Sequence, residues 1–388
     1  MSPQGVRPHA DLESAAMTDA ALASLTHLVL WCAFAVGLLF GAVAQRTGFC
    51  TMGAVSDIVT MGDWTRMRQW ALAAGIAMLG FAALAWTGTV NPAKTLYAST
   101  RWLWLSALSG GALFGLGMAL ASGCASKTLV RVGGGSLKSV VVMVVLGVAG
   151  FATLKGITAV WRTATVDRIA IESTIQASLP AWASQVLPVN TPVAALAIAL
   201  VIGIALLAFA LLEREFSSHG NNLLAGLGVG AAVLAMWWVT SNLGHVAEHP
   251  QTLEETFLAT NSTRAEGLSF VSPIAYTLDW LMFFSDKSKL LSVGIVTVAG
   301  VIAGSAVVAL AQRSFRWEGF GDTTDLGHHL VGAVLMGVGG VTAMGCSIGQ
   351  GISGISTLSA TSFVALAAML AGATAGIRYQ MWRLDRQA

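Results

Sequence analysis

Three cysteines are the residues most suited to chemistry, because each follows a glycine or a Gly-Phe pair at the end of an apolar stretch. They are Cys50 in GFCTMGAVSD (48–57), Cys124 in ASGCASK (121–127) and Cys346 in AMGCSIGQG (343–351). A thiol offers a weak S–H donor and a weak sulfur acceptor. Its ordinary pKa of about 8.5 leaves it protonated at neutral pH, and apolar surroundings keep it so. We therefore expect these thiols to hydrogen-bond a soft anion without holding it as tightly as a cation would.

Groups that follow the cysteines could add positive potential. The residues after each cysteine are expected to begin a short helix, whose N-terminus carries fractional positive charge. Lys127 and Arg131 could strengthen this field near Cys124, although cytoplasmic topology determinants are an equal alternative. Gln350, four residues after Cys346, could donate an amide hydrogen to an oxyanion or could simply cap backbone. The candidate substrate-binding residues are Cys50, Cys124, Cys346, Gln350, Lys127 and Arg131.

The remaining polar residues have simpler expected roles. Cys32 lies within the first apolar run and is expected to pack as a small buried side chain. Asp57 and Asp279 are candidates for function because carboxylates are rare within membranes, but capping or interfacial placement is the competing explanation. Four histidines lie near the expected span ends, where contact with solvent or the interface accounts for them: His219, His245, His328 and His329.

Several other kinds of chemistry are not expected. No CxxC pair or Cys/His ligand spacing occurs, so we expect neither a zinc nor an iron–sulfur site. No GxxxxGK[ST] motif occurs, so ATP use by this chain is not expected. The net charge of +2 comes without a basic tract, which disfavours nucleic acid as a partner. We therefore expect no metal, no cofactor and no catalytic residues.

The elements that must position these residues are membrane helices. The chain of 388 residues is 55% hydrophobic and only 10% charged, whereas soluble domains carry about 25% charge. Long stretches lack Asp, Glu, Lys and Arg altogether, the longest being 326–377. A membrane-spanning helix needs about 20 apolar residues, and no alternation typical of a β-barrel is present. The composition therefore predicts an all-α polytopic membrane protein that interacts with membrane lipid.

About nine transmembrane helices are predicted, and four further segments are too apolar for ordinary loops. The predicted spans are 26–45, 69–89, 102–121, 139–159, 192–212, 222–240, 290–311, 328–344 and 360–378. The other four segments are rich in Gly, Ser and Thr: 47–62, 122–137, 268–284 and 345–359. Non-helical backbone at membrane depth is tolerated when it is buried in protein or lines a cavity. We therefore expect four re-entrant segments, each with a short helix.

An internal repeat relates the two halves of the chain. GGALFGLGMALASGC (110–124) matches GAVLMGVGGVTAMGC (332–346) at seven of 15 positions, and four of those seven are glycine. GLLFGA (37–42) likewise resembles GLGVGA (226–231). Four spans in each half, with one extra span between them, make the repeat inverted, an arrangement common in secondary transporters.

The expected organisation follows from this repeat. It comprises a polar N-terminal tail (1–25), a first transmembrane repeat (26–159), a connecting span (160–221), a second repeat (222–378) and a cytoplasmic tail (379–388). An acidic insertion, 241–267, is expected to be exposed to solvent. We expect no cleavable signal peptide, because no short apolar core followed by a small-residue cleavage site precedes the first span. A modest excess of Lys and Arg in one set of loops favours an external N-terminus and a cytoplasmic C-terminus.

The cysteine segments, the broken pieces and the duplication together resemble the YeeE/YedE family of sulfur transporters in bacterial inner membranes. The motifs that carry the resemblance are TGFCTMGAVSD, ASGCASKTLVRVGGGSLKSVVV and MGCSIGQGISG, and it extends over about residues 26–380. It implies a multi-pass inner-membrane protein that takes up thiosulfate or a related sulfur compound. It further implies that Cys50, Cys124 and Cys346 pass the anion along by S–H hydrogen bonds. A separate TusA-like cytoplasmic sulfur carrier is the implied partner.

Three functions remain open at this point, the third being a structural or channel-type protein for another small anion. The first is a permease for thiosulfate, a small dianion whose soft terminal sulfur suits thiol donors. The second is a membrane sulfurtransferase in which a cysteine thiolate attacks the substrate and becomes a persulfide. That reaction needs a thiol activated by a nearby base or cation, and no histidine lies within ten residues of the three cysteines. The permease is therefore the favoured prediction, and it is not an enzyme.

Overall fold

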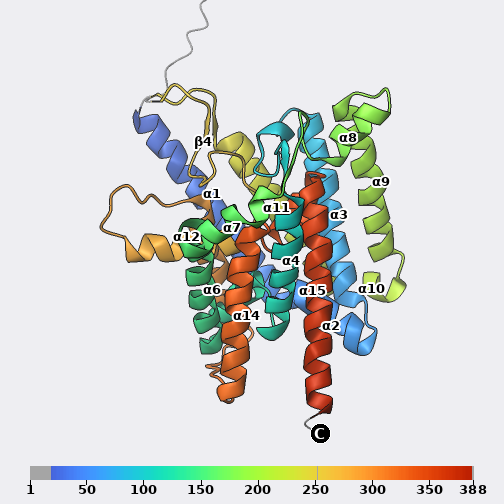
Figure 1. Cartoon of the computed structure of the whole chain (residues 1–388), viewed down its shortest axis with the longest axis vertical. Coiled ribbons are helices and arrows are strands. Elements are labelled where there is room, and N and C mark those ends of the chain that lie inside the picture. Colours follow the sequence, from blue (N-terminus) through green and yellow to red (C-terminus); the bar gives the residue numbers. More distant parts are fainter. Residues whose placement is uncertain (1–18, 251, 387–388) are drawn as a thin grey trace, which may run out of the picture.

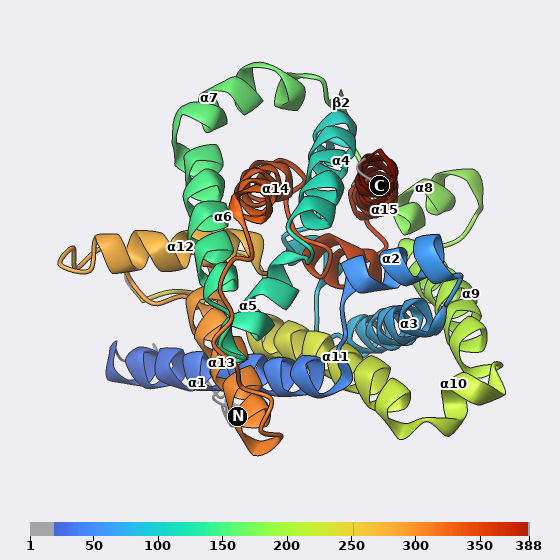
Figure 2. The same cartoon turned by 90° about the horizontal axis from the view of Figure 1, so that it is seen from below.

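The chain folds into a bundle of long helices, seen from the side in Figure 1 and from below in Figure 2. The structure is a computed structural model that describes residues 19–250 and 252–386, so the predicted tail over 1–18 lies outside the described residues. The long helices are α1 (Asp19–Thr47), α3 (Thr65–Trp86), α4 (Trp104–Leu120), α6 (Leu137–Lys155), α9 (Thr191–Leu211), α11 (Gly220–Trp238), α13 (Val293–Ala311), α14 (Thr323–Thr342) and α15 (Ala360–Asp385). In Figure 1, α1 begins near one end of the bundle and α15 finishes at the other.

A helix lies over each of the nine predicted spans, which confirms an all-α polytopic membrane protein. Eight of these helices are long and apolar enough to cross a membrane. The ninth, α14, is less apolar because its first two turns carry Asp325, His328 and His329. The helices also run beyond the predicted spans. The first begins at Asp19, and α15 continues to Asp385 through most of the expected cytoplasmic tail.

Short helices occupy all four segments that the sequence marks as broken, as predicted. They are α2 (Thr51–Met61), α5 (Ala125–Gly133), α12 (Val271–Met282) and the π-helical turn η4 (Gly349–Gly354). Each packs against long helices: α2 on α3 and α15, α5 on α13 and α6, α12 on α6 and α13, and η4 on α15 and α3. Figure 2 shows α5 inside the ring of long helices. Their depth in the bilayer stays a prediction.

The remaining elements connect the long helices. They are α7 (Ile157–Ala164), α8 (Leu179–Val186), α10 (Arg214–Ser218), η1 (Pro92–Lys94), η2 (Val166–Arg168) and the π-helical η3 (Val239–Leu243). Two antiparallel pairs join β1 (Arg101–Trp102) to β2 (Ile171–Glu172) and β3 (His245–Val246) to β4 (Thr256–Phe257). The second pair lies in the acidic insertion, where Glu248, Glu254 and Glu255 are exposed as expected.

Glycines allow α4 and α14 to pack backbone to backbone at the centre of the bundle. A β-carbon on Gly117 would lie 2.7 Å from the Gly332 carbonyl oxygen, and one on Gly339 would lie 2.6 Å from the Gly110 carbonyl oxygen. The two helices are therefore antiparallel, and the glycines shared by the repeated stretches form the contact. Small residues that let helices approach are typical of membrane bundles. This packing fixes where the following cysteines lie.

Candidate functional site

Each of the three cysteines lies two residues after a left-handed residue that ends a long helix. These residues are Gly48 with φ of 70°, Ser122 with φ of 54° and Met344 with φ of 59°. After α4 and α14 the turns have the same hydrogen bonds, Gly123 N–H to Met118 carbonyl at 2.9 Å and Gly345 N–H to Gly340 carbonyl at 2.8 Å. Such bonds stop a helix and turn the chain sharply. The local sequence thereby places each thiol at a break in the helix.

Each cysteine also lies at or just before the start of the next helical segment, and in two of the three the sulfur accepts a backbone N–H three residues later. The Gly53 N–H donates to Cys50 Sγ at 3.4 Å, and the Gly349 N–H donates to Cys346 Sγ at 3.3 Å. Cys124 likewise precedes the first residue of α5, but its sulfur makes no such capping bond. A side chain in this position caps the orphan donors of a helix. The expectation that helices start at the cysteines is confirmed, and their positive ends point at the sulfurs.

The three segments bring their cysteines together inside the bundle. Cys50, Cys124 and Cys346 are 8%, 0% and 1% exposed, respectively, so none faces lipid. The side chains of Cys50 and Cys124 lie close enough to interact directly, and Ser347, the residue after Cys346, also contacts Cys124. All four cysteines are free thiols. Cys32 stands apart on α1, half-buried against the core, as a packing residue should be.

Three serine hydroxyls accompany these thiols, and the sequence did not single them out. Ser126 Oγ lies 3.2 Å from Cys124 Sγ, and Ser269 Oγ lies 3.9 Å from Cys346 Sγ. Ser347 is fully buried, and within the described chain its hydroxyl has no hydrogen-bond partner. A buried hydroxyl without a partner is costly. The site therefore holds at least one polar group that a bound ligand could satisfy. Ser126 and Ser347 adjoin motif cysteines, which is the signal that could have found them.

Basic side chains lie on the α2 and α5 side of the cysteines. Lys127 is close enough to Cys50 and Cys124 to interact with both electrostatically. The side chains of Lys127 and Arg131 both lie against Gly123, next to Cys124. Neither has a carboxylate within 4.0 Å among residues 19–250 and 252–386. Unpaired cations inside a membrane bundle are costly, so this part of the site is built to receive negative charge.

Arg66 is a third cation of this group, and the sequence did not mark it as a candidate. Its Nε lies 3.3 Å from Oδ2 of the buried Asp57, while its guanidinium reaches over Gly53. Arg66 itself is partly exposed, with 44% of its side chain accessible. Asp57 therefore holds a guanidinium between solvent and the cysteines. Asp279 pairs in the same manner with Lys289, Oδ2 to Nζ at 2.6 Å.

Gln350 is fully buried, and both ends of its amide bond to protein atoms. Its Nε2 donates to the Ala343 carbonyl at 2.7 Å, and its Oε1 accepts from Ser362 Oγ at 2.5 Å. These bonds join η4 to α15 and to the end of α14. This is the backbone-capping alternative considered from the sequence, so Gln350 supports the Cys346 turn.

A cavity of about 250 Å³ approaches the cysteines from the opposite side. Ser269 lines it and also contacts Cys346. Glu266 lines it too, with Oε1 accepting from Ser262 N–H at 2.9 Å and from Ser262 Oγ at 2.6 Å. Burial raises the pKa of this carboxyl, against the lowering effect of the Ser262 hydrogen bonds. The expectation that the whole insertion is exposed was wrong for Phe257 and Ala265, which are buried, and Glu266 is only partly exposed.

Comparison with known proteins places this geometry in context. The family described as "Sulphur transport" matches residues 46–375. The thiosulfate transporter TsuA of Escherichia coli (strain K12) is 25% identical over 355 residues, which cover 87% of this chain and 90% of that protein. The thiosulfate transporter TsuA of Spirochaeta thermophila is 27% identical over 348 residues, covering 87% of this chain and 94% of that protein.

Proposed function

Because this chain belongs to the sulphur transport family, we propose that it is a permease for thiosulfate or a similar small sulfur-containing anion. The observation that carries the proposal is the meeting of three buried thiols, from three separate helix breaks, between a cavity and a group of cations. Both named relatives above are thiosulfate transporters. Transport needs sites that bind an ion weakly enough to release it, and neutral thiols meet that need.

Entry is proposed to occur through the 250 Å³ cavity. Ser269 is the link, since its hydroxyl belongs to the cavity wall and lies beside Cys346. The hydroxyl and the thiol can both donate to an oxyanion or to a terminal sulfur. Beyond the charged lining residues Arg162 and Glu266 the anion meets these weak donors, and together with the positive end of η4 they offset its dehydration.

Transfer is proposed to continue to Cys124 and Cys50. Ser347 bridges the step, because it adjoins Cys346 in the chain and contacts Cys124 in space. Its unpartnered hydroxyl is free to donate to the passing anion. Cys50 and Cys124 face each other from α2 and α5, so one anion can hydrogen-bond both thiols at once.

Exit is proposed to pass Lys127, Arg131 and Arg66. The first two have no carboxylate partner in the described part of the chain, so an anion leaving the thiols would meet cations that are not neutralised. Arg66 is accessible to solvent and forms the last contact. In the proposed orientation, with the N-terminus outside, this side is cytoplasmic, and a TusA-like carrier would collect the sulfur there.

Helix packing supports the proposed inverted repeat. In this repeat α1 corresponds to α11, α3 to α13, α4 to α14 and α6 to α15. The contact between α1 and α13 then has its counterpart in the contact between α11 and α3. The contact of α4 with α15 likewise has its counterpart in α14 with α6. The equivalent left-handed residues Ser122 and Met344 agree with this correspondence. The two halves would then meet at the thiols.

Uptake of radiolabelled thiosulfate by cells that lack other sulfate and thiosulfate importers tests the proposal. Cys50→Ala, Cys124→Ala and Cys346→Ala should each reduce uptake strongly at equal amounts of protein in the membrane, whereas the control Cys32→Ala should not. Unchanged uptake in all three variants would rule out the thiol pathway. Serine variants distinguish a permease from a sulfurtransferase, since a hydroxyl still donates hydrogen bonds but cannot form a persulfide.

A further inference from the structure

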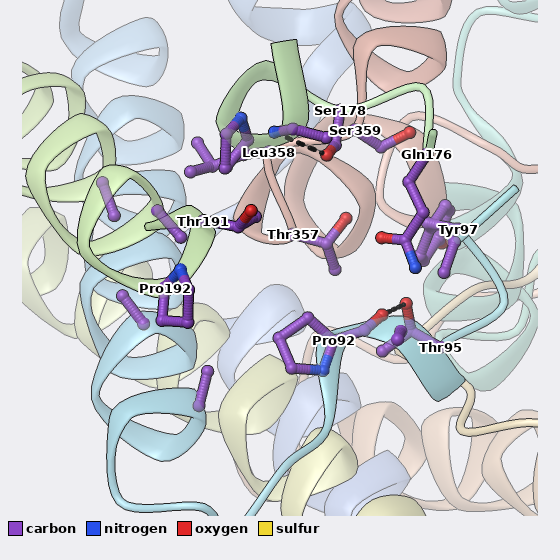
Figure 3. A pocket seen from close by; sticks show the side chains of 18 of the residues that line it. Pro92, Thr95, Tyr97, Gln176, Ser178, Thr191, Pro192, Thr357, Leu358 and Ser359 are labelled. Carbon is purple, nitrogen blue, oxygen red and sulfur yellow. Dashed lines mark hydrogen bonds between the residues drawn. The ribbon is translucent and has the colours of Figure 1, made fainter. Parts of the chain in front are cut away.

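A second and larger cavity is lined by none of the cysteines, and no step of the proposed transport uses it. Its volume is about 550 Å³, and it is enclosed by α3, the 91–98 segment, α8, α9 and the 356–359 turn (Figure 3). Ligand sites commonly have volumes of about 300–1,000 Å³ and a mainly apolar lining with a few polar groups. None of its lining residues is Asp, Glu, Lys, Arg or His, so it is unsuited to an anionic substrate. The occupant must be uncharged.

Two polar side chains in this cavity have nothing to bind within the protein. Ser359 is 2% exposed and begins α15, yet its hydroxyl neither caps that helix nor has any partner in the described chain. Serine at this position normally caps the helix, so a different partner is needed. Gln176 extends its amide between Thr357 and Tyr97 in Figure 3, and no hydrogen bond to that amide is present among residues 19–250 and 252–386.

The cavity is bounded by the helix that is most exposed to lipid. Only 22% of the 18-residue apolar stretch of α9 is buried within the protein, the lowest share among the eight apolar helices. Its contacts with long helices run mainly to α3, whose Ala82, Ala85 and Trp86 form the facing wall. Trp86 is exposed on the bundle surface. The cavity therefore lies directly behind the helix that is least covered by protein, the side from which a molecule dissolved in the bilayer would approach it.

We propose that this cavity binds an uncharged amphipathic lipid, with its acyl chain against α3 and α9 and its hydroxyl or ester group on Gln176 and Ser359. The apolar wall takes the chain, and the two unpartnered side chains take the polar group. A charged lipid is excluded, because burial of a charge without a partner is costly.

Photolabelling of the full chain in phosphatidylcholine vesicles tests this site directly, using a monoacylglycerol whose diazirine lies at the end of the acyl chain next to the ester group, so that it sits beside Gln176 and Ser359. The label should map to peptides covering 174–185 and 356–359. The same chain ending in a carboxylate, used at alkaline pH, should label these peptides at least about tenfold less. Gln176→Leu should lower labelling about two- to tenfold, the loss expected for one hydrogen bond.

A pair of variants on α9 supplies the matched control. Ala195 lines the cavity, whereas Ala197 is exposed on the same helix and does not. Ala195→Phe should fill the cavity and abolish labelling of the two peptides, while Ala197→Phe should leave it unchanged, both at unaltered unfolding temperature. Equal labelling in Ala195→Phe and wild type, or label confined to the exposed face of α9, would overturn the proposal. Because binding is measured rather than uptake, the result does not depend on thiosulfate transport.

Discussion

Replacing Gly53 by alanine should separate the role of Arg66 from that of the fold. Gly53 lies in the first turn of α2, three residues after Cys50, and a β-carbon there would lie 2.6 Å from Arg66 Nη1. Ordinary contact begins at 3.4 Å, so the guanidinium must retreat by about 0.8 Å, the difference between the two distances. The displaced atom is the end of a flexible side chain and can move cheaply. The Gly53 N–H that donates to Cys50 is retained in alanine.

The expected result is weaker transport by a protein that is at least as stable. Alanine is favoured over glycine inside a helix by up to about 1 kcal/mol, so the unfolding temperature should stay constant or rise. The Arg66 Nε to Asp57 Oδ2 distance is already 3.3 Å, so such a shift of the guanidinium should weaken this pair. Partly exposed ion pairs contribute about 1 kcal/mol or less. Uptake at low thiosulfate should therefore fall about three- to fivefold.

A double-mutant cycle checks that Arg66 is the intermediary. Uptake is measured for Gly53→Ala, Arg66→Gln and the double variant, together with unfolding temperature in detergent. If the alanine acts only through the guanidinium, the double variant should be no worse than Arg66→Gln alone. A further loss of similar size in the Arg66→Gln background would refute this reasoning, as would a fall in unfolding temperature for Gly53→Ala.

Three further outcomes are expected. Burial raises the pKa of Glu266, so the stability that this carboxyl contributes is greatest below the usual Glu value near 4.5 and is lost as pH rises through the raised value. The wild-type protein should therefore unfold at a higher temperature at pH 5 than at pH 7.5. Glu266→Gln should weaken this pH dependence. Gly339→Val places a side chain into the backbone of α4 and should lower the free energy of unfolding of the protein by at least about 1–3 kcal/mol, which thermal unfolding would measure. Gly327→Val is the control, because the space around Gly327 is open and its stability should be unchanged. Gln350→Leu leaves the Ala343 carbonyl and the Ser362 hydroxyl without their hydrogen bonds, so the free energy of unfolding should fall by about 2–4 kcal/mol. A variant of normal stability that is defective only in uptake would contradict the supporting role of Gln350.

Some features of the site could be predicted from local sequence because they arise locally. Cys124 and Cys346 follow the same run of glycines. Each lies two residues after the left-handed residue that ends a helix, where the next helical segment can begin. Arg66 and Ser269 could not be found in this way. They are 16 and 77 residues from the cysteines beside which they lie, and only packing of separate helices brings them there. Gln350 was a reasonable candidate, but its bonds to Ala343 and Ser362 depend on how α14 and α15 meet.

The sequence alone determined that this is an all-α membrane protein, where its helices lie, and which thiols mark the breaks between them. These features follow from apolar length and backbone preference, both of which act over a few residues. The tertiary structure alone decided that the thiols meet, that Arg66 and Asp57 pair near them, and that Glu266 lines a cavity. Such contacts depend on the angles and separations of helices far apart in the chain, set by many weak packing contacts that no short stretch of residues encodes.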